Sequence, residues 1–165
     1  MPIFESHIQV RVQRPESDGK VLMMPPQHAL QHAGPILQVT VSPTKQHIDA
    51  LISQGQTPPE AIPGYAIIDT GASMTAVDED VCRRLGLQPT GSQKTAHAGG
   101  PDIRACYPIQ VSFPGTPLPS FSTPRAMSVN LQFGKTPYIL LFGRDLLARI
   151  KFVYNGPARR IELAF

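Results

Sequence analysis

The sequence has no long hydrophobic run, and no apolar stretch approaches the about 20 residues that a membrane-spanning helix needs. Its first residues also lack a basic start followed by an apolar core, which is the pattern of a secretory signal peptide. Both absences argue against a membrane partner, and we expect a soluble, cytoplasmic protein.

Charged side chains are also scarce. They make up 16% of the chain against 41% hydrophobic residues, which argues against a disordered charged polymer. The net charge is +3, and basic residues occur in short pairs, Arg83-Arg84 and Arg159-Arg160. Nucleic-acid binding needs a clustered basic face, so we expect no nucleic-acid partner.

Cysteine occurs only twice, as Cys82 in a predicted helix and Cys106 in a predicted strand. Neither lies in a C-x-x-C spacing, so no metal or redox motif is present, and we expect neither a metal nor a cofactor. The count allows one disulfide, but two buried free thiols fit a chain of this size better.

Proline and glycine, in contrast, are plentiful, with 18 and 13 residues. They favour short strands joined by turns over a helix bundle. The length of 165 residues suggests one domain plus an extension, with a core that needs no disulfides. We therefore divide the chain into an N-terminal strand and Pro-rich arm over 1–33 and a main domain over 34–165, with an insertion over 43–64.

Hydrophobic periodicity predicts a mostly β domain with a few short helices. Residues 14–34 read as a loop or a loosely docked arm. Predicted helices cover 42–55, with Ser42 as N-cap and Gly55 as stop, and also 78–87 and 144–150. Predicted strands cover 7–13, 35–41, 65–69, 125–133 and 138–143, together with hairpins around Gly99-Gly100 and Asn155-Gly156.

One turn, which begins at Asp69, contains the candidate functional residues. The apolar strand ending in Ala66-Ile67-Ile68 finishes on the carboxylate of Asp69, and the small residues Thr70, Gly71, Ala72 and Ser73 follow. An aspartate in such a place is often an ordinary turn former or helix cap. Here the small neighbours let main-chain N–H groups and a ligand come close to the carboxylate, which favours a functional site.

The sequence Asp69-Thr70-Gly71-Ala72-Ser73 after an apolar strand resembles the retropepsin-like aspartic proteases. A second motif of that family, apolar-apolar-Gly-Arg-Asp-x-Leu, is similar to the stretch from Leu140 to Leu147, which contains Gly143, Arg144 and Asp145. The order of the two motifs and the glycine-tipped hairpin between them also match. Actin-like kinases share the Asp-x-Gly pattern, but they need two large lobes that this chain is too short to form.

The resemblance implies a closed β-barrel that forms one half of an acid protease. It implies that Asp69 is catalytic, that Thr70 locks the turn across a dimer axis, and that Gly71, Ala72 and Ser73 form the substrate strip. Gly143, Arg144 and Asp145 would be structural. Retroviral members often carry an acid at the position of Ser73, which pairs with the arginine matching Arg144. That ion pair is impossible here, so Arg144 is expected to reach another acid or a carbonyl.

The hairpin tip resembles the flap that closes over substrate in this family, with His97, Ala98, Gly99 and Gly100 at its turn. The alternative is a plain surface hairpin with an exposed histidine. Family members also interleave their terminal strands in a dimer, and the C-terminal residues 160–165 or the predicted strand 7–13 are the candidates here.

A single Asp-Thr-Gly implies two chains, because the family's chemistry needs two carboxylates that share one proton and one water. The expected function is therefore an aspartic endopeptidase that cleaves extended polypeptides as a homodimer, with a second copy of itself as its partner. The alternative is a binding or assembly module that keeps this fold without significant catalysis.

Overall fold

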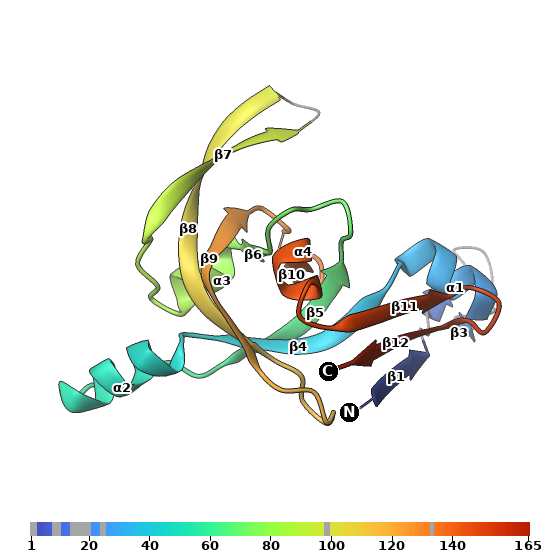
Figure 1. The fold of residues 1–165 in the computed structure, drawn as a ribbon, viewed down its shortest axis with the longest axis horizontal. Coiled ribbons are helices and arrows are strands. Elements are labelled where there is room, and N and C mark those ends of the chain that lie inside the picture. Colours follow the sequence, from blue (N-terminus) through green and yellow to red (C-terminus); the bar gives the residue numbers. More distant parts are fainter. Residues whose placement is uncertain (1–2, 8–10, 14–20, 24–25, 98–99, 133) are drawn as a thin grey trace.

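A computed structural model describes residues 3–7, 11–13, 21–23, 26–97, 100–132 and 134–165 of the chain (Figure 1). Strands dominate, and the four helices in these residues are short. The elements in chain order are β1 (Ile3–His7), β2 (Arg11–Gln13), β3 (Val21–Met23), α1 (Pro26–Ala33), β4 (Ile36–Ser42), α2 (Lys45–Ser53), β5 (Ile62–Ile68), β6 (Ala76–Asp78), α3 (Glu79–Arg84), β7 (Gly91–His97), β8 (Gly100–Ser112), β9 (Phe121–Val129), β10 (Tyr138–Phe142), α4 (Arg144–Leu147), β11 (Lys151–Asn155) and β12 (Arg160–Ala164).

Six strands form a closed barrel, which confirms the predicted fold class. Their order is β4-β5-β10-β6-β9-β8, and pairing between β8 and β4 closes the ring. Strand β7 pairs with β8 alone and therefore forms an edge outside the ring. The barrel places the ends of β5 and β10 next to each other, because these two strands run parallel with Ile68 opposite Phe142.

The barrel interior is filled by alternating apolar residues, as the period of two in the sequence predicts. Val39 and Val41 of β4 are fully buried, and so is Ile109 of β8. Three phenylalanine rings meet edge to face at centroid distances of 5.8 to 6.4 Å, a favourable aromatic geometry. These are Phe113, Phe121 and Phe142. Cys82 and Cys106 are buried free thiols, as expected.

A second, three-stranded sheet has the order β1-β12-β11. Strand β12 is flanked on both sides by strands of its own chain, so neither of its edges is open to another chain. Arg160 pairs with Glu5 at 3.4 Å and with Glu162 at 2.9 Å, which holds β1 against β12. The strand predicted over residues 7–13 lies partly outside the described residues, because 8–10 are not described. On either side of them, His7 pairs within β1 with β12, and Arg11–Gln13 pairs with β3 in another sheet.

The predicted loop over residues 14–34 contains β3 and the helix α1. Pro26 opens α1 at the helix position where proline is tolerated. Leu30 is only 1% exposed and belongs to the main hydrophobic core, and its carbonyl oxygen accepts a hydrogen bond from the Tyr154 hydroxyl. The segment before β4 is therefore packed into the domain through α1.

The helix predicted in the insertion is present as α2, but it begins later. Thr44, not Ser42, is the N-cap, and it accepts a hydrogen bond from the N–H of His47. Gly55, with a φ of +71°, follows the helix as predicted. No residue of α2 is buried, Ile52 is 58% exposed, and the helix projects away from the barrel (Figure 1). Across the described part of the chain, every helix falls short of the length and apolar character of a membrane span.

Candidate active site

The Asp69 turn starts where β5 leaves the barrel. The N–H of Asp69 donates to the carbonyl of Phe142 on β10 at 3.1 Å, which fixes the turn to two neighbouring strands. The Oδ1 atom of Asp69 accepts hydrogen bonds from the N–H groups of Gly71 at 2.9 Å and Ala72 at 3.1 Å. Within the described residues no hydrogen bond reaches Oδ2, so this oxygen is open to a water molecule.

Gly71 makes this arrangement possible. A Cβ atom at this position would lie 3.1 Å from Asp69 Oδ1, closer than ordinary van der Waals contact. Glycine therefore lets the main chain fold closely around the carboxylate. Thr70 lies at the exposed outside of the turn, where a second molecule can reach it.

The main chain of the second motif packs directly against that of the first. The N–H of Arg144 donates to the carbonyl of Ala72 at 3.0 Å. A Cβ atom on Gly143 would lie only 2.4 Å from the carbonyl carbon of Met74, so the two main chains touch where Gly143 passes. This contact explains why the second motif requires glycine at this point.

Asp145 and Thr75 connect the two motifs. Asp145 Oδ1 accepts from the N–H of Thr75 at 2.8 Å and from its hydroxyl at 2.7 Å. The same hydroxyl oxygen accepts from the N–H of Gly143 at 3.2 Å. Asp145 therefore ties the two motifs together, and the structural role that the resemblance implies for it stays a prediction. Thr75, which is fully buried, was not singled out from the sequence, although a polar residue before the apolar pair Ala76-Val77 was a signal.

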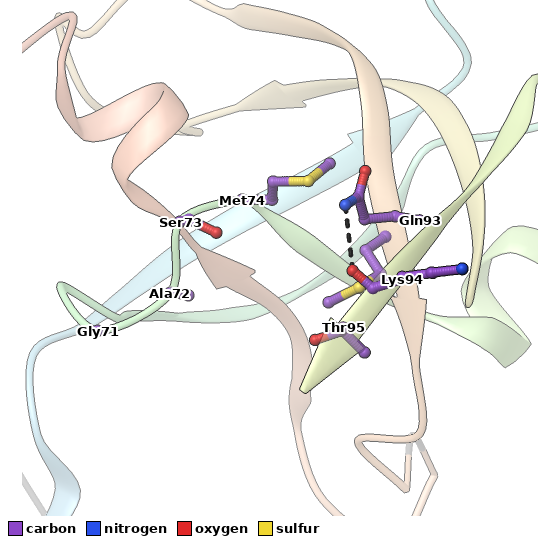
Figure 2. A pocket seen from close by; sticks show the side chains of 8 residues that line it. Gly71, Ala72, Ser73, Met74, Gln93, Lys94 and Thr95 are labelled. Atoms are coloured by element: carbon purple, nitrogen blue, oxygen red, sulfur yellow. Dashed lines mark hydrogen bonds between the residues drawn. The ribbon is translucent and has the colours of Figure 1, made fainter. Parts of the chain in front are cut away.

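A cavity of about 220 Å³ lies between the turn and strand β7 (Figure 2). Gly71, Ala72 and Ser73, which were predicted to form the substrate strip, line one side. Asp69 and Thr70 are not among the lining residues. Met74 extends this side by one residue, and Thr95 belongs to the predicted flap hairpin. Gln93, Lys94 and Met127 also line the cavity and were not predicted, because they come from strands distant in sequence from the turn.

The predicted flap is a long hairpin of β7 and β8 that rises beyond the barrel (Figure 1). His97 pairs with Gly100, whose φ is +104°, a conformation that favours glycine. Ala98 and Gly99 lie outside the described residues. The cavity is lined by residues 93–95 of β7, so the hairpin contributes to it below the tip.

The Arg144 side chain reaches no acid or carbonyl among the described residues. It is exposed, and in the described part of the chain its only hydrogen bonds are those of its main chain. The expectation of a replacement partner for Arg144 is therefore not met within this chain.

Within the residues that the structure describes, neither of the other two buried or motif carboxylates has the setting of Asp69. Asp78 is buried and caps α3 by accepting from the N–H of Asp80, while its other oxygen accepts from the N–H of Leu131 at 2.7 Å. Asp145 is bonded to Thr75. Among the described residues, no group of three or more His, Cys, Asp or Glu side chains is placed to hold a metal ion.

Comparison with known protein families bears on the resemblance. Residues 37–113 match the model of a retropepsin-like family described as aspartyl protease. The match spans the Asp69 turn and the β7–β8 hairpin, and the motif around Gly143 follows outside it. It confirms the resemblance drawn from the two motifs. A search of curated proteins found no match.

Proposed function

We propose that the protein is an aspartic endopeptidase whose active site forms between the Asp69 turns of two identical chains. The observation that carries this proposal is the turn itself. One oxygen of Asp69 is held by two main-chain N–H groups, the other is open, and the turn borders a cavity facing an unpaired strand edge.

The second carboxylate would come from a second copy, because Asp78 and Asp145 are each committed to hydrogen bonds within the chain. A twofold axis brings the same patch of two chains together. Thr70 and Gly71 are exposed at the turn and would form part of that contact. Strand β12 has no open edge, so a partner would meet the outer edges of β1 or β11 instead.

In the proposed reaction the pair of carboxylates shares one proton, because two negative charges at this distance are unfavourable. The ionised carboxylate takes a proton from water while the water oxygen attacks the peptide carbonyl carbon. The protonated carboxylate gives its proton to the carbonyl oxygen. Proton transfer to the peptide nitrogen then releases the amine, and the other product is a carboxylic acid.

The substrate would lie extended beside β7. Among the described strands it pairs only with β8, so its other edge can hydrogen-bond through its main chain to an added peptide strand. Such binding would place the peptide between β7 and the residues 71–74, across the cavity.

Digestion of a peptide library by the wild type and by Asp69→Asn, at several pH values, tests this proposal. An asparagine Oδ1 still accepts from Gly71 and Ala72, so the variant should fold, whereas cleavage should fall by at least about 100-fold because the acid-base group is lost. Glu60→Gln, at an exposed loop acid, is the matched control and should cleave normally. Specific activity should also fall on dilution as a dimer dissociates. Cleavage by a strict monomer would refute the two-chain site.

A binding or assembly module is the second candidate. Helix α2 is the observation that favours it, because this helix has no buried residue and projects from the barrel, with the side chain of Ile52 58% exposed. A module of this kind would bind its ligand equally well with Asp69→Asn and would cleave no peptide in the library.

A further inference from the structure

Strand β7 is an edge strand, and residues 93–95 on it face the Asp69 turn across the cavity. An unpaired edge offers carbonyl and N–H groups to an incoming peptide strand. One of these carbonyls, that of Lys94, is already in use, because the side-chain Nε2 of Gln93 donates to it at 3.1 Å. Figure 2 shows this bond on the side of Lys94 that faces Ser73.

Arg125 of β9 fixes the orientation of the Gln93 amide. Its Nη2 donates to Gln93 Oε1 at 3.3 Å and to the carbonyl of Ser92 at 3.1 Å. A guanidinium group has only donors, so the Oε1 atom must face it. The amide nitrogen is then directed to the Lys94 carbonyl, and the alternative amide orientation would place two donors against each other.

We propose that Gln93 is a positioning residue for peptide binding. Its side-chain amide protects the edge of β7 by hydrogen-bonding to it in the free protein and is displaced from that edge by a bound peptide. In the free protein, its amide satisfies the Lys94 carbonyl. A bound peptide takes this carbonyl with one of its own N–H groups. The displaced amide, still held by Arg125, then donates to a carbonyl of the peptide, so every polar group stays paired.

This inference rests on the proposed function, since it takes an extended peptide as the ligand. It adds that the side-chain amide of Gln93 takes part in the main-chain contact between β7 and the peptide. A peptide with proline or an N-methyl group at the residue opposite Lys94 would lack the required N–H and should be rejected.

The kinetic test compares Gln93→Ala and Gln93→Glu with the wild type on a peptide that the wild type cleaves. Loss of the donor should raise KM about 3- to 10-fold and leave kcat within about twofold, because the bond is formed in the ground state and the transition state alike. Gln88→Ala, at an exposed glutamine outside the cavity, is the matched control and should change neither value. An unchanged KM for Gln93→Ala, or an equal fall in kcat, overturns the proposal.

A second measurement needs no turnover. NMR resonances of the Gln93 side-chain amide, assigned by their loss in Gln93→Ala, should show slow hydrogen exchange in the wild type and fast exchange in Arg125→Met. Fast exchange in the wild type overturns the proposal even if peptides are cleaved. If the wild type cleaves no peptide, the proposed function fails. The exchange rate of the Gln93 side-chain amide still decides whether this amide is hydrogen-bonded to the edge of β7.

Discussion

Asp145 and Thr75 are joined by two hydrogen bonds to a single carboxylate oxygen, at 2.8 Å from the N–H and 2.7 Å from the hydroxyl of Thr75. Seventy residues of sequence separate the two side chains. These two hydrogen bonds hold the residues that follow the Asp69 turn against the start of α4. The position of the turn therefore depends on the second motif.

Replacing Asp145 with alanine should lower the free energy of unfolding by about 3 kcal/mol, because it leaves two donors of the buried Thr75 without an acceptor. Urea denaturation followed by circular dichroism measures the change. The control is Asp49→Ala, which removes an exposed ion pair with Lys45 and should cost less than about 1 kcal/mol. Similar losses in the two variants would contradict the structural part assigned to Asp145.

Gly143 should not tolerate any side chain. An alanine Cβ would lie 2.4 Å from main-chain atoms of Met74, and backbone cannot move aside as a flexible side chain can. We expect Gly143→Ala to destabilise the protein by at least about 2 kcal/mol, measured by thermal or urea unfolding. Gly91→Ala is the matched control, since its Cβ would meet no atom within 4 Å, and it should fold with nearly unchanged stability. A stable Gly143→Ala protein would show that the two motifs do not pack this closely.

The parts of the site that lie within short sequence motifs could be predicted from the sequence. The turn after β5 and the part played by Asp145 follow from short stretches whose order is informative. Thr75, Gln93 and Met127 could not be found in this way, because their places depend on contacts between distant segments: Thr75 bonds to Asp145, and strand pairing brings Gln93 and Met127 to the cavity. β6 and β9, for example, are distant in sequence and pair in parallel, with Ala76 opposite Met127.

The N-terminal segment was predicted least well, for two physical reasons. Residues 7–13 alternate like a strand, but the pairing of β1 with β12 ends at His7, and alternation alone does not set register. Helix α1 has eight residues, begins at the second of two adjacent prolines and, among its residues of described burial, places one large side chain, Leu30, in the core. Too few apolar positions recur for a helical period to be visible.

Helix α1 should nevertheless be required for stability. Leu30 is buried in the same core as the barrel residues, so Leu30→Ala should cost about 2–4 kcal/mol by leaving a cavity. Guanidinium unfolding measures this loss. Ile52→Ala on α2 removes an apolar side chain that is 58% exposed and should change stability by less than about 0.5 kcal/mol. If Leu30→Ala is as stable as Ile52→Ala, the segment before β4 is not part of the folded core.

Cys82 should make stability depend on pH in the alkaline range. Burial, helped by the nearby negative charge of Asp78, raises the pKa of its thiol from 9.0 to about 12. Above pH 9 the unfolded chain loses this proton while the folded chain keeps it, so the stabilisation present below pH 9 is lost as the pH rises toward 12.

Between about pH 8 and pH 10, this thiol should account for a loss of about 1 kcal/mol in the free energy of unfolding. Urea titrations of the wild type and of Cys82→Ala at the two pH values isolate the contribution, because every other titrating group is common to both proteins. The variant will be less stable at both pH values, since it loses a buried side chain, but its stability should fall less steeply with pH. An equally steep fall in Cys82→Ala would assign the alkaline destabilisation to other groups and would mean that the thiol titrates normally in the folded protein.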